Sequence, residues 1–542
     1  MLRLIRDHPS RSVVATIIIL TMFTLRPLPS SILLVALVVL LRITTQWIIP
    51  RPYAIGRLII VWLAVSTGCY ISFAIAGSTT VTSKFPTVLY SSIYSLLGLI
   101  PVVLSAITRR AGFEFPLIWA TGWWLISRFS PIGRLGAWSP LAGDDLYEWM
   151  RPFVGEYGID WAIGGWVEVC SCFAVWYLMG ARPQDDRDHE FEEEQSSPLS
   201  LPRVPTIWSQ DHVNLLIIAL LVLAIPSAFV SPLPTALHGE DVRDVGVACV
   251  LPPPSNDSFA FTSFKRETRT VAGQAHIVLW PEGAVGFDSA EDRRDKLEEM
   301  RLDANVSGIY IGISFTEPEL DSNRSYTGKR RNGIAIVSSD GVILEYYKRN
   351  FIPSIDSIPQ VGGQAPPSTV LIQLGTVSKP RSRWNMTLST MIGPDFAHPF
   401  TNLDTRPTLI LGPARTWQLH AGRVMIEMAR RRADELGTTV LWCDDGEAGL
   451  SGLVGQGHSG VQVGYGSWVK RMSVEVPLNE ARTPYGCMGE WGGFLAACLP
   501  IFVTKFSLAR FLDCIDVTMA RIRNWFNRRR RNRNPRPNFV DI

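Results

Sequence analysis

The feature that most constrains this chain is a set of long stretches without charged side chains. Leu58–Ser83, Phe85–Thr108 and Val213–His238 contain no Asp, Glu, Lys or Arg, and Ser12–Leu41 contains only Arg26. A helix needs about 20 apolar residues, rising about 1.5 Å each, to cross roughly 30 Å of hydrocarbon. We therefore predict a multi-pass α-helical membrane protein with about eight spans, near residues 12–27, 31–49, 57–77, 86–107, 113–129, 160–180, 212–231 and 491–509.

The order of these spans, seven followed by one, predicts four parts of the chain. A solvated, acidic cytoplasmic loop is expected near the end of the first part, because residues 185–194 have the sequence DDRDHEFEEE. The four predicted parts of the chain are a seven-span domain at 1–235, which contains this loop at 182–211, an extramembrane domain at 240–488, a last span at 489–512 and an Arg-rich cytoplasmic tail at 513–542.

Basic residues predict the orientation of the spans, because loops rich in Lys and Arg stay in the cytoplasm. The fifth loop is an exception, with Arg128, Arg134 and Arg151, but from Arg521 onward eight Arg face one Asp. We expect both termini in the cytoplasm and the 240–488 domain in the lumen of a secretory-pathway membrane. The supporting residues are Arg3, Arg6, Arg11, Arg51, Arg57, Arg109, Arg110, Arg182, Arg187 and Arg203.

Glycosylation sequons give a second indication of this orientation. The chain has four Asn-x-Ser/Thr sequences, and all of them fall between residues 240 and 488. We expect glycans at Asn256, Asn305 and Asn323, whereas Asn385 is the weakest acceptor because it opens an apolar strand. Chance occurrence of the four sequons is the alternative.

Motifs for phosphate and metal binding are absent from the sequence. It has no Gly-rich phosphate loop, no C-x-x-C and no H-E-x-x-H, so we expect no nucleotide, no metal and no cofactor. The basic tail is explained by orientation or by attraction to anionic lipid, at about 1 kcal/mol per Arg. We expect no nucleic-acid partner.

Short apolar runs alternate with amphipathic helical ones between residues 240 and 488. This alternation predicts a two-layered α/β domain with buried strands. Strands are expected at 245–251, 276–280, 308–315, 333–339, 342–347, 408–412 and 438–443, and helices at 289–305 and 417–436.

Three charged residues directly follow apolar strands and are candidate site residues. Glu282 follows HIVLWP, Lys348 follows VILEYY, and Asp395 follows NMTLSTMIGP. Charged groups at strand ends converge at the rim of a sheet, where sites usually form. The alternative for each residue alone is a solvated strand end.

These segments resemble a known family. HIVLWPE, YYKRNFIP and MIGPDFAHP, within about 120 residues, are similar to the Glu, Lys and Cys segments of the nitrilase (carbon-nitrogen hydrolase) superfamily. Seven spans before such a domain and one after resemble its membrane branch, apolipoprotein N-acyltransferase. Further similar segments are WWLISR with LGAWSP (123–140), residues 413–442 and TPYGCMGEW (483–491). The resemblance implies an αββα sandwich between spans seven and eight.

The resemblance also implies a chemistry and roles for residues. In this family a thiolate takes an acyl chain from phospholipid as a thioester, and an amine then accepts the chain. By resemblance Glu282 is the general base, Lys348 stabilises the oxyanion, and Asp356 stands where the family has a second glutamate. The implied partners are a membrane phospholipid and an unidentified amine or protein acceptor.

The nucleophile is where this chain departs from the family. Gly393 occupies the position of the cysteine, and no Cys lies between Cys249 and Cys443. Ser389 is about 13 Å away along an extended strand and Thr390 about 10 Å, too far for attack at about 3 to 3.5 Å. Asp395 is closer, but it matches the family's acidic position and is expected to brace the turn.

The cysteines outside this interval leave alternatives open. Cys443 is either a relocated thiol or a buried structural residue, and the second is the more common case. Cys249 is expected in the core, and a lumenal disulfide between Cys249 and Cys487 is one option. Glu168, a carboxylate inside the sixth span, should face a protein or aqueous interior, with a snorkelling interfacial group as the alternative. His398 is expected to be a turn residue.

Two functions follow from the missing thiol. The first is a membrane acyltransferase whose nucleophile is replaced or bypassed, so that an amine attacks the ester directly with Glu282 as base. The second is a catalytically inactive descendant, a pseudoenzyme that binds lipid or a partner. Retention of Glu282 and Lys348 favours the first, although a buried ion pair is also kept for structural reasons.

Overall fold

The computed structural model describes residues 9–26, 29–76, 84–108, 113–141, 146–179, 210–229, 241–253, 260–320, 326–352, 361–375, 383–399, 403–446 and 449–505. The chain divides into two compact units, Met1–Phe494 and Leu495–Ile542. Residues 495–505, the described part of the second unit, are helical. Asn256, Asn323 and Asp356 lie outside the described residues.

A helix occupies each of the eight positions predicted for a span. They are α2 (Pro9–Thr24), α3 (Ser31–Ile48), α4 (Ala54–Ala76), α5 (Lys84–Thr108), α6 (Glu114–Phe129), α7 (Arg151–Met179), α8 (Gln210–Ala224) and α13 (Glu490–Lys505). Within the described ranges, four helices are long and apolar enough to cross a membrane, at Ser31–Ile48, Ala54–Ala74, Thr87–Thr108 and Glu148–Tyr177. The number of spans and their orientation stay predictions.

The N-terminal helices are apolar on their outer surface as well as in their contacts. Leu34, Leu37 and Leu41 of α3 are fully buried at helical spacing. On α4, Ile55 and Leu63 are 76% and 51% exposed. Helices that are apolar all round are typical of a hydrocarbon environment, where the outer side chains contact lipid.

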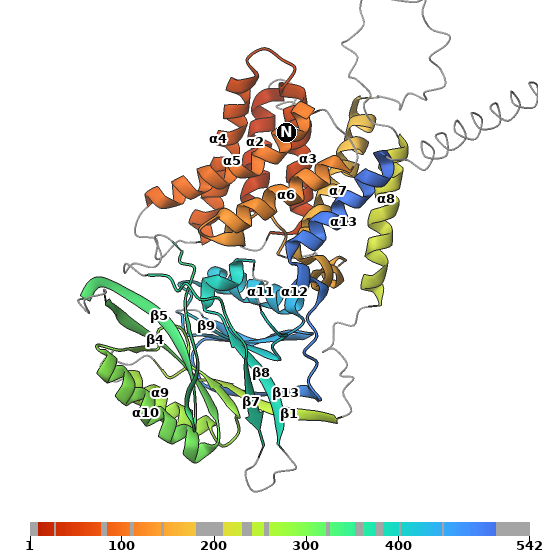
Figure 1. Ribbon diagram of the computed structural model, residues 1–542. Coiled ribbons are helices and arrows are strands. Elements are labelled where there is room, and N and C mark those ends of the chain that lie inside the picture. The colour runs from red at the N-terminus through yellow and green to blue at the C-terminus, as the bar shows by residue number, and fades with distance from the viewer. Residues whose placement is uncertain are drawn as a thin grey trace, which may run out of the picture. The chain divides into compact units, whose positions relative to one another are not determined.

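Two mixed β-sheets form the α/β part of the chain (Figure 1). The first sheet has the order β13-β1-β2-β4-β5-β6, with β3 beside β4, and the second has the order β12-β11-β10-β9-β8-β7. The strands of the first sheet are β1 (Asp241–Cys249), β2 (Ile277–Leu279), β3 (Val285–Gly286), β4 (Tyr310–Leu320), β5 (Tyr326–Ser338), β6 (Gly341–Tyr347) and β13 (Trp468–Val476). Those of the second are β7 (Val370–Leu374), β8 (Trp384–Thr390), β9 (Leu409–Ala414), β10 (Thr439–Asp444), β11 (Leu450–Gly455) and β12 (His458–Val463).

Side chains that alternate along the strands fill two kinds of core. Val245 and Val247 of β1 pack against Leu409 and Leu441 of the second sheet, whereas Ala248 of β1 faces the helices on the outside. Helices α9 (Ala260–Val271) and α10 (Ala290–Ser307) cover the first sheet, and α11 (Leu419–Leu436) covers the second (Figure 1).

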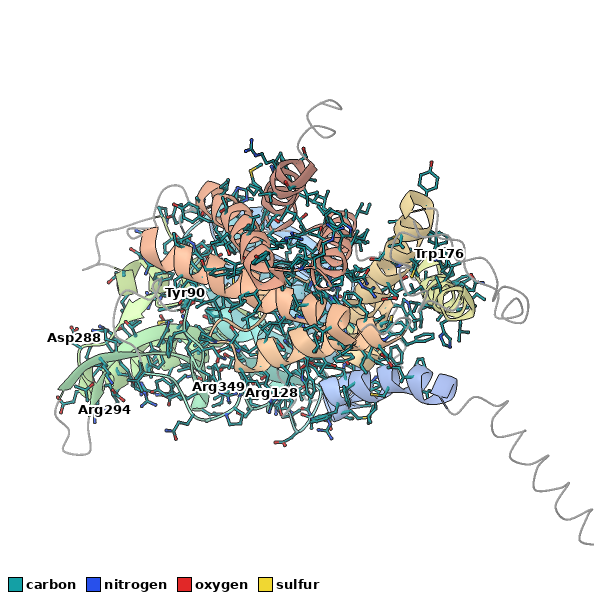
Figure 2. The ribbon with its side chains drawn as sticks, turned by 90° about the horizontal axis from the view of Figure 1, so that it is seen from above. Tyr90, Arg128, Trp176, Asp288, Arg294 and Arg349 are labelled. Carbon is teal, nitrogen blue, oxygen red and sulfur yellow. A yellow bond between two sulfur atoms is a disulfide. The ribbon has the colours of Figure 1, made fainter. Side chains whose placement is uncertain are left out.

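The layers are therefore helix, sheet, sheet and helix. The αββα order agrees with the arrangement expected from the family resemblance, whereas the residue pattern alone predicts only two layers. The outer face of α10 is polar, and Arg294 on it is 76% exposed (Figure 2). Both long helices of this part, at 290–307 and 419–436, confirm the predicted ones to within two residues.

Candidate active site

The ends of several strands meet at one end of the sandwich. In the first sheet β2 pairs in parallel with β4, and β4, β5 and β6 pair antiparallel in turn, so β6 runs in the same direction as β2. In the second sheet β8, β9 and β10 are parallel. The amide N–H of Glu282 donates to the carbonyl of Ala414 at the end of β9, 3.2 Å away. Residues that follow these strands are therefore brought together.

Glu282 and Lys348 form a buried ion pair at this end. Their side chains are 9% and 3% exposed, and Lys348 Nζ donates to Glu282 Oε1 over 2.8 Å. The same oxygen accepts a hydrogen bond from Asn332 Nδ2 over 2.6 Å. Two donors on one oxygen fix the orientation of the carboxylate. The structure thus brings together two of the residues that the sequence singles out.

Gly393 lies against the other oxygen of this carboxylate. It begins the 3₁₀ turn η7 (Gly393–Ala397) directly after β8, and its φ of +39° lies in the left-handed region that favours glycine. A Cβ added at Gly393 would lie 2.7 Å from Glu282 Oε2. A side chain at the position predicted for the nucleophile would therefore meet the carboxylate of the predicted base, but Gly393 has none.

Asp395 holds the loop after β6 in place. Its carboxylate accepts hydrogen bonds from the hydroxyl of Tyr346 (2.7 Å) and from the backbone and side-chain N–H groups of Asn350 (2.9 Å each). Burial raises the pKa of Asp395, and the hydrogen bonds from Tyr346 and Asn350 oppose that rise. The amide of Arg349, the residue after Lys348 (Figure 2), also points to this carboxylate. Asp395 thereby joins η7 to the loop after β6.

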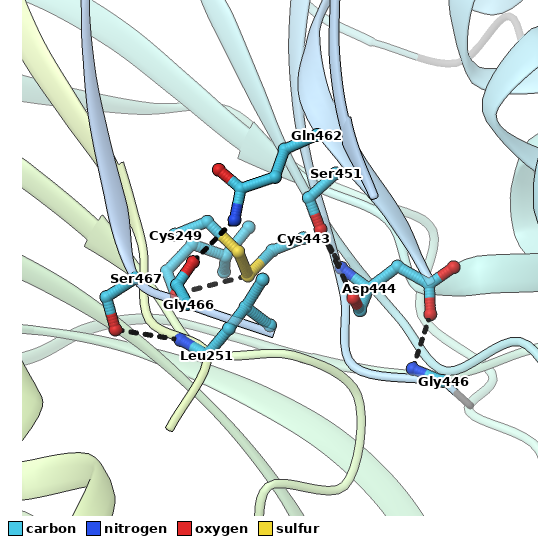
Figure 3. The surroundings of a disulfide bond; sticks show 10 residues. Cys249, Leu251, Cys443, Asp444, Gly446, Ser451, Gln462, Gly466 and Ser467 are labelled. Carbon is cyan, nitrogen blue, oxygen red and sulfur yellow. Dashed lines mark hydrogen bonds between the residues drawn. A yellow bond between two sulfur atoms is a disulfide. The ribbon is translucent and has the colours of Figure 1, made fainter. Parts of the chain in front are cut away.

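Cys443 carries no thiol, which overturns its proposed role as a relocated nucleophile. Its sulfur forms a disulfide with Cys249, joining β10 of one sheet to β1 of the other (Figure 3). The suggested pair of Cys249 with Cys487 is therefore wrong as well, and Cys487 is a free, exposed cysteine. The two sheets place Cys249 and Cys443 on facing strands, with their Cα atoms 5.5 Å apart.

The neighbouring hydroxyls do not replace the missing thiol either. Ser389 Oγ donates to the carbonyl of Ser368, 2.9 Å away. Thr390, the last residue of β8, is fully buried. Neither hydroxyl is found in a hydrogen bond with Glu282 or Lys348 among the residues that the structure describes.

Two further polar residues near the pair escape the sequence analysis. Asn332 lies on β5, where the pattern RRNGIAIV offers one signal, a polar residue at the start of a buried stretch. Asp445 follows β10, and burial raises its pKa to about 7; the charges of Asp444 and Glu282 act in the same direction, while Arg415 opposes them. Asp445 therefore lies within electrostatic range of the Glu282 carboxylate.

The remaining predicted residues lie elsewhere. Asn305 on α10 and Asn385 on β8 are exposed, which is compatible with glycan attachment. Glu168 of α7 is fully buried and forms an ion pair with Arg42 of α3. The expectation that Glu168 faces a protein interior is confirmed, and the snorkelling alternative is wrong.

His398, just after η7, gives a pH-dependent prediction for stability. Burial lowers the pKa of His398 from its usual 6.5 to about 4, and Arg432 acts in the same direction. The unfolded chain therefore takes up a proton below pH 6.5 that the folded chain refuses until about pH 4. Stability should fall over this interval as pH is lowered, by about 2 kcal/mol at pH 5.

Thermal unfolding of the full-length protein in detergent, at pH 7 and pH 5, measures this effect. His398→Asn should lose less stability between the two pH values than the parent protein does. Equal losses in both proteins would show that His398 has an ordinary pKa in the folded state.

Comparisons with known proteins give a partial likeness. No protein-family model matches the sequence, and no curated protein matches it. The solved structures that are similar to this chain include members of the CN-hydrolase or nitrilase superfamily. A CN-hydrolase superfamily protein of Xanthomonas campestris, with an arsenic adduct in its active site, is 16% identical over 43% of this chain and 91% of its own, with a TM-score of 0.33.

Two eukaryotic structures are similar to the same degree. Nit3 of Saccharomyces cerevisiae, a member of branch 10 of the nitrilase superfamily, is 16% identical over 45% of this chain and 94% of its own, with a TM-score of 0.30. The NitFhit protein of C. elegans is 17% identical over 44% of this chain and 61% of its own, also with a TM-score of 0.30. At these identities and TM-scores the likeness transfers neither activity nor site residues to this chain.

Proposed function

We propose that this chain is a membrane-embedded acyltransferase of the nitrilase type, related to apolipoprotein N-acyltransferase, which transfers a fatty acyl chain from a phospholipid to an amine. The observation that supports this most is the buried Glu282–Lys348 pair in contact with Gly393. A buried carboxylate can act as general base, and an ammonium beside it can stabilise an oxyanion. Asp356, outside the described residues, stays a candidate second acid.

The transfer proceeds by direct attack, because Gly393 supplies no thiol. The amine nitrogen attacks the ester carbonyl carbon of the phospholipid and gives one proton to Glu282. Lys348 stabilises the negative charge on the former carbonyl oxygen. The bond from carbon to the ester oxygen then breaks, and the leaving oxygen takes the proton from Glu282. The products are an amide and a lysophospholipid, and no acyl-enzyme forms.

The domain at 240–488 is proposed to lie on the lumenal side of a secretory-pathway membrane. The Cys249–Cys443 disulfide supports this placement, because disulfides persist in oxidising compartments. The exposed sequon at Asn305 is consistent with it. The termini are proposed to be cytoplasmic, with Asn256, Asn305 and Asn323 as glycan acceptors.

Mass spectrometry tests the proposed activity directly. The full-length protein is incubated with vesicles of phosphatidylglycerol that carries isotope-labelled acyl chains, together with a peptide that has a free N-terminal glycine. The expected result is labelled, N-acylated peptide and lysophospholipid, with no acyl group on the protein. A hydroxylamine-sensitive adduct on the protein would contradict direct attack, and the absence of any product would contradict the activity.

A second candidate function is that of a catalytically inactive protein that binds lipid or a partner. The observation in its favour is the combination of Gly393 at the nucleophile position and a disulfide at Cys443, which leaves the site without a thiol.

The variant Gly393→Cys distinguishes these two functions. Its Cβ would lie 2.7 Å from Glu282 Oε2, so the carboxylate must move, and the left-handed φ adds a cost of about 1–2 kcal/mol; folding of the variant is therefore measured first. With an active geometry, the new thiol takes the acyl chain, and a thioester at residue 393 accumulates on incubation with labelled phosphatidylglycerol. A folded variant without an adduct would favour a pocket that only binds. Cys487→Ser, at an exposed free cysteine, is the control for non-specific acylation.

A further inference from the structure

Asn332 is the residue that contacts both members of the ion pair. Its backbone carbonyl accepts a hydrogen bond from the amide of Lys348 over 2.8 Å. Its side-chain Nδ2 donates to Glu282 Oε1 over 2.6 Å. The residue is 4% exposed and lies on β5, a strand fixed by neighbours on both sides. It therefore holds Glu282 and Lys348 in register with each other.

The side-chain oxygen of Asn332, Oδ1, does not contact the ion pair in this way. Oδ1 is buried, and it accepts no hydrogen bond from any residue that the structure describes. Rotating the amide by half a turn would not satisfy it, because the carbonyl oxygen would then face the Glu282 carboxylate, and both groups are acceptors. Buried polar atoms are rarely left without a partner, so a free acceptor here indicates that something else supplies the donor.

The position of this oxygen defines what that donor can be. Oδ1 and Nδ2 are bonded to the same carbon, so the free acceptor belongs to the same amide group that contacts the Glu282 carboxylate. A group that reaches both acceptors must donate two hydrogen bonds from one atom or from adjacent atoms. A primary amine meets this requirement, since its nitrogen carries two protons in the neutral form, whereas a secondary amine carries one.

We propose that Asn332 Oδ1 accepts a hydrogen bond from the attacking amine and makes the site selective for primary amines. This inference rests on the proposed acyl transfer. One N–H proton of the amine passes to Glu282 as the nitrogen bonds to the ester carbonyl carbon. The second N–H stays on the nitrogen and donates to Asn332 Oδ1, which orients the lone pair toward the carbonyl carbon. An N-methyl amine has no proton left for this contact.

A comparison of two peptides that accept the acyl chain tests the proposal. The full-length protein acts on vesicles of phosphatidylglycerol and phosphatidylcholine, with a peptide that begins with glycine or with its twin that begins with N-methylglycine. The ratio of the two rates in the parent protein includes both the steric effect of the methyl group and the missing hydrogen bond. In Asn332→Leu, which is close in size, we expect the preference for glycine to fall about tenfold, equivalent to about 1.4 kcal/mol.

Asn350→Leu is the matched control. Asn350 is a neighbouring asparagine whose amide contacts Asp395, not Glu282, so its loss should change both rates together and leave their ratio as in the parent protein. If Asn332→Leu also lowers both rates equally, Asn332 only positions Glu282 and the proposal is overturned. Should this variant not fold, Asn332→Ala removes the same acceptor oxygen and should show the same fall in the ratio; an unchanged ratio there overturns the proposal.

Failure of the proposed function gives a different result. In that case the parent protein acylates neither peptide, and the selectivity of Asn332 is refuted together with the activity. When the parent protein acylates the glycine peptide, the activity stands, and the ratio in the variants decides the role of Asn332 alone.

Discussion

Replacing Glu282 with Gln is expected to lower acyl transfer to an amine by about a thousandfold or more. The amide cannot take a proton from the attacking nitrogen, and general base catalysis contributes roughly 10²–10⁴ in rate. Lys348→Ala should cause a loss of similar size, because one donor to a developing oxyanion contributes about 10²–10³. Rates of labelled amide formation, measured in vesicles by mass spectrometry, check both expectations.

The controls for this experiment must separate chemistry from folding. Each single substitution removes one charge of a buried ion pair, and breaking such a pair destabilises a protein by about 3–5 kcal/mol. The double variant Glu282→Gln with Lys348→Met removes both charges and should recover stability without recovering activity. Glu298→Gln and Lys329→Ala change the same residue types at exposed positions and should leave the rate near that of the parent protein. Parental rates in Glu282→Gln would refute the proposed chemistry.

Local signals were sufficient to predict the apolar helices, the helices α10 and α11, and most of the strands of the first sheet. A span requires a long apolar run, and every such run contains a helix. The strands near residues 277, 311, 336 and 344 have compact apolar cores, so a short window finds them. The helix α9 was missed because eight of the twelve residues in AFTSFKRETRTV are polar, although its buried residues, Phe264, Thr268 and Val271, have helical spacing.

The second sheet is harder to predict because its edge depends on tertiary contacts. SGLVGQGHSG, which forms β11 and β12, is rich in glycine, a residue that is rare in strands. The edge of the first sheet has the same difficulty, because β13 pairs with β1 across more than 200 residues and no local window contains that pairing. The alternation of apolar and polar residues along a strand shows which face is buried. It does not show which apolar residues of another strand that face contacts, so the facing of the two sheets could not be predicted.

Some residues of the candidate site could be predicted from the sequence and others could not. Glu282 and Lys348 could be predicted because each is a charge directly after an apolar strand. Asn332 lies inside a strand next to two arginines, and its one local signal, a polar residue at the start of a buried stretch, does not show that it contacts Glu282. The partner of Cys249 also depends on the fold, since Cys443 is 194 residues away and only the stacking of β1 on β10 brings the sulfurs together.

Removing this disulfide, with Cys249→Ala and Cys443→Ala together, is expected to lower the free energy of unfolding by about 2–5 kcal/mol. A disulfide stabilises a protein by restricting the unfolded chain, and this effect increases with the length of the closed loop. Because this bridge closes a loop of 194 residues, we expect a loss in the upper part of the range. Both sulfurs are also fully buried between the sheets, so the variant loses packing as well. Chemical unfolding of the full-length protein in detergent, with and without a reductant, measures the difference.

Reductant and a second cysteine variant distinguish a bridge from two buried thiols. A reductant should destabilise the parent protein toward the level of the double variant and should leave the double variant unchanged. Cys487→Ala, at a free and exposed cysteine, should unfold like the parent protein under both conditions. If Cys487→Ala is destabilised as much as the double variant, the bridge involves Cys487 and the pairing of Cys249 with Cys443 is wrong. Peptide mapping under non-reducing conditions identifies the bonded pair independently, because a fragment with Cys249 should be recovered joined to one with Cys443.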